Sequence, residues 1–182
     1  SNVIYITIST GIGGGFFLNN RLYRGSEGFA GEIGHIKPFG QGQTCNCGGK
    51  DCLEAWASGS AMERMASANW NETEEGRPID TPFIFNKAEQ GDKDAQAIIN
   101  NASTSIGIGL SNLITLLNPT CMVIGGGIAS NRPEFLERVI HILKKEAIRP
   151  AVEITALQIV KAELEPDSGI WGSYALLTGL AV

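Results

Sequence analysis

Apolar and β-branched residues fill the first stretch of the chain, residues 3–8, and such a run favours a β-strand. A glycine-rich turn, residues 10–15, leads from it into a second apolar run. Asn19 and Asn20 then predict a two-residue turn, because asparagine tolerates the left-handed backbone of tight hairpins, and residues 21–23 predict the returning strand. Together these signals predict a meander of three strands at one side of a sheet.

Helical periodicity begins near residue 53. Small and apolar residues recur on one helical face between about 53 and 66, and Thr81-Pro82 is typical of the start of a short helix, since proline is tolerated in a first turn. Asp92 is expected to cap a long helix from about 94 to 117. Small residues in the second half of that helix predict close packing against another backbone: Gly107, Gly109 and Ser111.

Strands and helices alternate in the remaining sequence. Asn118-Pro119 is expected to stop the long helix. The elements predicted after it are a buried strand at 121–124, a helix from 133 to about 147, a strand at 152–160 and a helix from 168 to about 180. This order indicates an α/β domain. The polar segment 71–77 is interpreted as a surface connection.

A glycine-rich segment of weak periodicity, about residues 24–54, separates the meander from the helices. Ordering so long an irregular loop costs roughly 1–2 kcal/mol per residue in backbone entropy, so we expect something to organise it. Its cysteines suggest a metal. Cys45, Cys47 and Cys52, with His35 ten positions before the first of them, are the Cys₃His set of a closed tetrahedral zinc site. Gly48 and Gly49 allow the chain to turn back toward the ion.

Two disulfides are the alternative for the four cysteines, but three of them lie within eight positions and a protein of this size needs no covalent staples. We interpret Cys121, in an apolar strand, as an inert buried thiol.

Composition adds limits on compartment and partners. The 182 residues are 43% apolar and 18% charged, with a net charge of −5, so a folded domain is expected and nucleic-acid binding by this acidic segment is not. No apolar run approaches the ~20 residues of a membrane span, and we expect a cytoplasmic protein. A strand begins after only Ser1-Asn2, which predicts that the chain is part of a longer protein.

Two glycine loops follow predicted strands. Thr10 and Gly11 belong to a loop between two strands, where backbone N–H groups can converge on a phosphate, although a tight hairpin explains the same glycines. Gly126 and Gly127 follow a buried strand and precede a helix, where ligands commonly bind in α/β sheets. The pair predicts a nucleotide site.

Two carboxylates lie beside the predicted zinc ligands. Glu32 is three residues before His35, and Glu54 is two residues after Cys52. A rigid carboxylate can accept hydrogen bonds from sugar hydroxyls, whereas a solvated surface charge is the ordinary alternative for each.

These residues together resemble a known family. The segments Gly31-Glu32-Ile33-Gly34-His35 and Cys45-Asn46-Cys47-Gly48-Gly49-Lys50-Asp51-Cys52-Leu53-Glu54 resemble the signature of the ROK family of sugar kinases and sugar-responsive repressors. The loops at 10–15 and 123–127 fall where that family has its phosphate turn and nucleotide loop. The resemblance covers essentially the whole chain and implies the C-terminal half of the actin-like, ribonuclease-H-like ATPase fold.

The resemblance also implies roles. Glu32, His35 and Glu54 would contact sugar hydroxyls, the first glycine loop would lie at the transferred phosphate of Mg·ATP, and the second would lie near the adenosine. The catalytic aspartate of the family belongs to its N-terminal domain, so residues 1–182 correspond to a C-terminal domain that is inactive alone. Ser9 replaces a usual glycine, a departure that weakens the kinase reading only slightly.

Three functions fit these patterns. The first is the C-terminal domain of an ATP-dependent hexose or amino-sugar kinase, glucokinase-like and homodimeric. The alternatives are the sugar-sensing domain of a ROK transcriptional repressor and a free-standing zinc-stabilised interaction domain. The retained glycines of the first loop favour the kinase.

Overall fold

Five strands form a mixed sheet in the structure, a computed structural model that describes residues 1–182 except 41, 71–75, 77, 154–156, 165–166 and 180–182. Their order across the sheet is β3-β2-β1-β4-β5. The strands are β1 (Val3–Ile8), β2 (Ile12–Leu18), β3 (Arg21–Tyr23), β4 (Cys121–Gly125) and β5 (Gln158–Lys161). β1 runs antiparallel to β2 and parallel to β4, and β4 runs parallel to β5. Asn19 and Asn20 have φ of 54° and 62°, which confirms the predicted turn.

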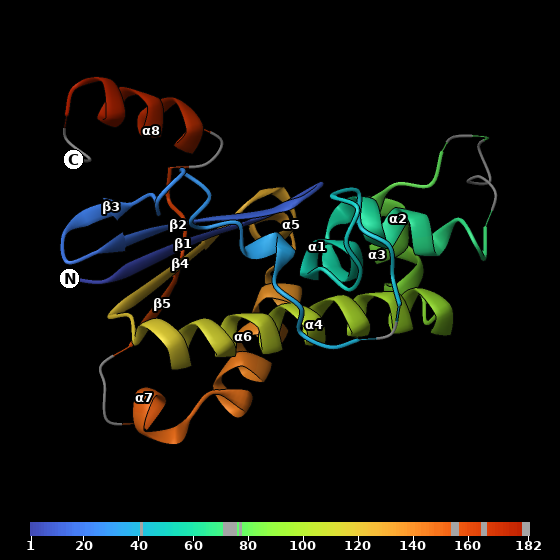
Figure 1. Cartoon of the computed structure of the whole chain (residues 1–182). Helices are drawn as coiled ribbons and strands as arrows, with labels where there is room; N and C mark the ends of the chain where they lie inside the picture. Colours follow the sequence, from blue (N-terminus) through green and yellow to red (C-terminus); the bar gives the residue numbers. More distant parts are fainter. Residues whose placement is uncertain (41, 71–75, 77, 154–156, 165–166, 180–182) are drawn as a thin grey trace.

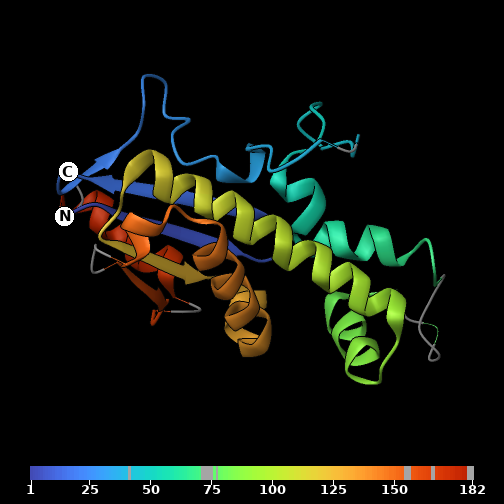
Figure 2. The same cartoon turned by 90° about the horizontal axis from the view of Figure 1, so that it is seen from below.

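Two helices cover one face of the sheet, α4 (Lys93–Leu117) and α6 (Pro133–Glu146) (Figures 1 and 2). Ile4, Ile6 and Ile8 alternate along β1 and are fully buried in the core. The predicted close packing of α4 is confirmed, because a Cβ on Gly107 would lie 2.5 Å from Ile142 of α6. The α/β class is therefore confirmed.

The final helix, α8 (Ser168–Leu177), lies on the opposite side of the sheet in Figure 1. A hollow of about 670 Å³, lined mainly by apolar surface, lies between it and side chains of β1 and β4. Trp171 and Tyr174 are more than half exposed. The helix ends at Leu177, three residues before the predicted end at about 180. Nearly all of the surface connection at 71–77 lies outside the described residues.

Between β3 and α4 the chain forms a helical segment whose helices lie beyond one end of the strands (Figure 1). Its elements are the 3₁₀ turn η1 (Ile33–His35), α1 (Leu53–Ala57), α2 (Gly59–Ala66) and α3 (Thr81–Glu89). The helix predicted from 53 to 66 is interrupted at Ser58, whose backbone is extended and whose side chain caps α2 by accepting from the Ala61 N–H. Asp80, one residue before the predicted start, caps α3 through the Phe83 N–H.

The predicted start of the last strand was wrong. The strand expected from 152 begins only at Gln158, because α7 (Arg149–Glu153) occupies the preceding segment, with Pro150 in its first turn. A short helix, α5 (Gly127–Asn131), also precedes α6.

The glycines at 13–15 lie within β2 rather than in a loop. Gly14 is needed there because a Cβ on it would lie 2.8 Å from the Ile33 side chain and 3.0 Å from the Tyr5 carbonyl oxygen. The strand glycines thus let η1 pack directly on the sheet.

No helix among the described residues is long and apolar enough to cross a membrane.

Candidate functional site

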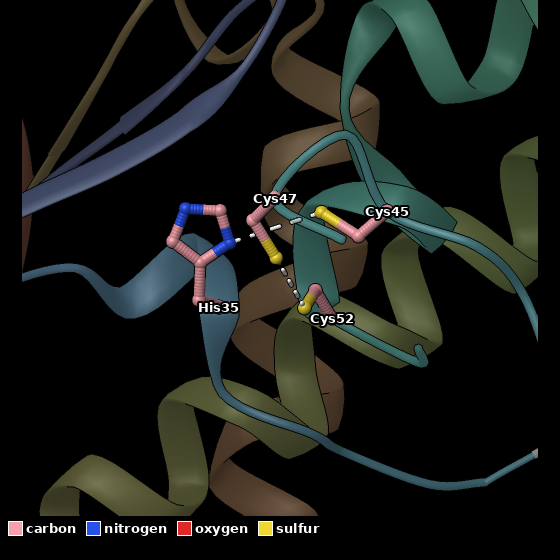
Figure 3. A group of neighbouring side chains, drawn as sticks. All are labelled: His35, Cys45, Cys47 and Cys52. Carbon is pink, nitrogen blue, oxygen red and sulfur yellow. Dashed lines mark hydrogen bonds between the residues drawn. The ribbon is translucent and has the colours of Figure 1, made fainter. Parts of the chain in front are cut away.

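The four predicted metal ligands converge in one cluster. The Sγ atoms of Cys45, Cys47 and Cys52 and a ring nitrogen of His35 lie within 4.8 Å of one another. Figure 3 shows the three sulfurs and the ring directed toward one another, with the His35 Nδ1 atom 3.8 Å from Cys45 Sγ and Cys47 Sγ 3.7 Å from Cys52 Sγ.

The separations of His35 Nδ1 from Cys45 Sγ and of Cys47 Sγ from Cys52 Sγ match those of ligands in a tetrahedral zinc site. Zinc–sulfur bonds of about 2.3 Å and zinc–nitrogen bonds of about 2.0–2.1 Å place tetrahedral ligand atoms roughly 3.5–3.8 Å apart. Three thiolates and one imidazole also complete the coordination, so this site leaves no position for a catalytic water. The cluster is therefore suited to a structural ion.

Hydrogen bonds around the cysteines stabilise the loop that carries them. The Asp51 carboxylate accepts from the N–H groups of Gly42 and Gln43, at 2.8 and 2.9 Å. The Cys45 N–H donates to the Gly49 carbonyl at 2.9 Å, closing the turn that contains Cys47. These bonds bring the three cysteines together over eight residues of chain.

The cysteines differ in their surroundings. Cys47 is exposed, and a hydrogen bond from the Gly49 backbone, with smaller contributions from the thiols of Cys45 and Cys52, lowers the pKa of its thiol. Burial, helped by the neighbouring thiols, raises the pKa of Cys52 to about 11. Burial also raises the pKa of Cys121, which lies in β4, apart from the cluster.

The two predicted carboxylates lie on opposite sides of the metal cluster along the chain and have different surroundings. Glu32 is largely exposed, and its carboxylate lies 3.8 Å from His35 Nε2, the nitrogen that does not face the sulfurs. Glu54 is half-buried in the first turn of α1, and its Oε2 atom accepts from the Ile12 N–H at 3.1 Å. That contact was not predicted, because the two residues are far apart in sequence.

The first predicted phosphate loop is a tight turn of three residues, Ser9–Gly11, that joins β1 to β2. Its Ser9 and Thr10 carbonyls accept from the Gly59 and Ser60 N–H groups at the start of α2, at 2.8 and 3.1 Å. Among the described residues, the N–H groups of Thr10 and Gly11 have no hydrogen-bond partner. Two free donors at an accessible turn are suited to anionic oxygens.

The turn separates two hollows. One of about 170 Å³ is lined by Thr10 and Gly11, together with Glu54 and Arg64. The other, of about 410 Å³, is lined by Thr7, Ser9, Gly126, Gly127, Ser130, Asn131 and Ser168. The structure thus brings the two predicted glycine loops to one end of the sheet.

Two glycines are required by close backbone approaches at this site. Gly126 has φ of 95°, and a Cβ there would lie 2.4 Å from the backbone of Ile8. A Cβ on Gly34 would lie 2.2 Å from the Ile12 carbonyl oxygen, so η1 contacts the end of the turn directly. Gly34 could be identified in the sequence as a glycine between Glu32 and His35, whereas its contact with Ile12 could not.

Comparison with known proteins places this arrangement in a family. The family model described as "ROK family" matches residues 1–179. The chain belongs to the ROK family. It is similar to the N-acetylmannosamine kinase of Haemophilus influenzae, with 32% identity over 173 residues, which are 95% of this chain and 54% of that protein. The chain therefore spans about half the length of the curated relatives it matches.

Solved ROK structures match the fold as well. The ROK hexokinase of Thermus thermophilus superposes with a TM-score of 0.82 at 36% identity, over 94% of this chain and 57% of that one. A ROK glucokinase from Streptomyces griseus, solved with glucose and AMPPNP, gives a TM-score of 0.72 at 32% identity, over 96% of this chain and 60% of that one. The predicted relation to ROK kinases and their fold is confirmed.

Proposed function

We propose that this chain is the C-terminal, sugar- and nucleotide-contacting domain of an ATP-dependent sugar kinase. The observation that carries the proposal is the Ser9–Gly11 turn, whose free Thr10 and Gly11 N–H groups lie between the Gly126–Gly127 loop and the half-buried carboxylate of Glu54. Phosphate and sugar ligands would meet at this turn.

In the proposed reaction, a sugar hydroxyl attacks the γ-phosphorus of Mg·ATP, the bond to the β,γ-bridging oxygen breaks, and ADP leaves. Positioning and charge stabilisation supply most of the catalysis in such transfers. The Thr10 and Gly11 N–H groups would donate to phosphate oxygens, and Gly126 and Gly127 would lie near the adenosine. A base from the other half of the protein would take the hydroxyl proton, so this domain alone would be inactive.

Glu32, His35 and Glu54 are proposed to bind the sugar. A carboxylate accepts from hydroxyls, and the His35 Nε2 atom can donate to one when Nδ1 is held by a metal. Zinc held by His35 and the three cysteines would be structural, fixing the backbone on which all three sugar ligands lie. The amino-sugar and glucose kinases among the relatives make a hexose or an amino sugar the substrate class to test.

The test is ADP release by the full-length protein with Mg·ATP and a panel that includes glucose and N-acetylmannosamine. We expect turnover with at least one sugar. Sugar binding without turnover, in a protein that also carries a DNA-binding domain, would favour the repressor alternative instead. A cytoplasmic homodimer is the proposed form, and a monomeric mass in solution would contradict it.

A further inference from the structure

The peptide unit between Gly11 and Ile12 is fixed on both of its sides. Its carbonyl, from Gly11, accepts from the Ser9 N–H at 2.9 Å. Its N–H, from Ile12, donates to Glu54 Oε2 at 3.1 Å. Because a peptide unit is planar, these two bonds together set its orientation and so the direction in which the turn enters β2.

This fixed orientation determines what the turn presents to a ligand. With the Ser9 N–H and the Ile12 N–H both used inside the protein, the donors that remain are those of Thr10 and Gly11, which pair with no other described residue. Thr10 is exposed and Gly11 is half-buried, so the turn is accessible to a ligand. A loss of the Ile12 bond would free that peptide to rotate and would disperse the donors.

Glu54 is suited to hold the peptide because its own position is constrained. It lies in the first turn of α1, whose N-cap is Cys52, and the buried Leu53 beside it donates its N–H to the Ile36 carbonyl at 2.8 Å. The fit to the turn is also tight: a Cβ on Gly11 would lie 2.8 Å from Glu54 Oε2. A carboxylate that accepts from a backbone N–H makes a charge-assisted bond, stronger than a neutral one.

We propose that Glu54 is a positioning residue for the phosphate-binding turn, in addition to its proposed contact with the sugar. One carboxylate oxygen, Oε2, holds the Ile12 N–H, and the other is left for a substrate hydroxyl. The inference rests on the proposed function and makes a separate prediction: Glu54 controls nucleotide affinity even when no sugar is present.

The experiment measures binding of Mg·AMPPNP to the full-length protein, without sugar, by calorimetry. Glu54→Asp keeps the charge but withdraws the carboxylate by one methylene, whereas Glu54→Gln keeps an oxygen within reach of the Ile12 N–H. We expect Glu54→Asp and Glu54→Ala to weaken nucleotide binding roughly tenfold, the loss typical of a hydrogen bond to a charged group, and Glu54→Gln to stay within about threefold. Glu32→Ala is the control, with weaker sugar binding and unchanged nucleotide binding.

A double-mutant cycle tests the contact itself. Gly11→Ala should weaken nucleotide binding in the parent protein, because the new Cβ displaces the Glu54 carboxylate, and should add little to the loss already caused by Glu54→Ala. Unchanged nucleotide affinity in both Glu54→Asp and Glu54→Ala, with sugar affinity lost, would reduce Glu54 to a sugar ligand. A parent protein that binds no nucleotide would instead overturn the proposed function, and this inference with it.

Discussion

The Nδ1 atom of His35 lies 3.8 Å from the sulfur of Cys45. The opposite ring nitrogen, Nε2, lies 3.8 Å from the Glu32 carboxylate. One imidazole therefore faces the metal cluster with one nitrogen and the proposed sugar site with the other. His35 therefore connects the metal cluster to the proposed sugar site.

Metal content is the first prediction. Protein purified without added zinc should contain about one equivalent per chain, since a Cys₃His set binds zinc tightly. Cys47→Ser should lose most of the metal, while Cys121→Ser, at a cysteine apart from the cluster, should keep it. Elemental analysis measures both, and less than about half an equivalent in the parent protein would contradict the assignment.

His35→Ala and Glu32→Ala should separate the two uses of the imidazole. Removing the ring should reduce both zinc content and sugar affinity, because each nitrogen serves one of them. Removing the Glu32 carboxylate should weaken sugar binding alone, by roughly tenfold for a hydrogen bond to a charged acceptor. Zinc analysis and sugar titration of the full-length protein measure both variants. Zinc loss in Glu32→Ala would contradict the separate roles of the two ring nitrogens.

Thiol reactivity should follow the environments of the cysteines. In chelator-treated protein, iodoacetamide should modify Cys47 first, because its thiol is exposed and the Gly49 backbone hydrogen bond lowers its pKa. Cys121 should react slowly, since burial raises its pKa. Zinc should protect Cys47 and leave the Cys121 rate unchanged. Mass spectrometry of the labelled peptides gives the order, and faster labelling of Cys121 would refute it.

Gly34→Ala should destabilise the protein, because the new Cβ would lie 2.2 Å from the Ile12 carbonyl oxygen and backbone must move to admit it. We expect a loss near the upper end of the about 1–3 kcal/mol typical of overpacking. Gly15→Ala is the matched control, since a Cβ there meets nothing within 4 Å. Denaturant unfolding of the two variants should differ clearly, and equal midpoints would show that η1 does not pack on the turn as described.

Asp92→Ala should cost about 1 kcal/mol of stability through loss of a helix cap. The Asp92 carboxylate accepts from the Asp94 and Ala95 N–H groups, both at 3.0 Å. Asp94→Ala removes a charge from the same first turn without removing the cap and should cost about 0.3–0.5 kcal/mol or less. Thermal unfolding compares them, and a larger effect at Asp94 would contradict the capping role.

The boundaries of α4 show which features of the fold follow from sequence. Asp92 and Asn118 mark its two ends by local backbone chemistry, a side-chain cap and a left-handed residue with φ of 40°, and both positions were predicted. Residues 152 and 153 were misread because α7 is only five residues long, too short for a helical period to show in the sequence. Ser58 was missed as a break because its side chain caps α2 while the apolar pattern continues through it.

Within the site, the metal cluster follows from the sequence, whereas the Glu54–Ile12 contact does not. The sequence alone determined the four proposed zinc ligands, because four soft or imidazole donors within eighteen residues can reach one ion through local turns. It also placed Glu32 and Glu54 beside those ligands. Only the tertiary structure decided that Glu54 holds the Ile12 peptide, because the two residues are 42 positions apart and meet only where α1 packs against the end of β1 and β2. Metal-binding groups can be recognised from residue types and their spacing, whereas a contact between distant segments depends on how the helices and strands pack.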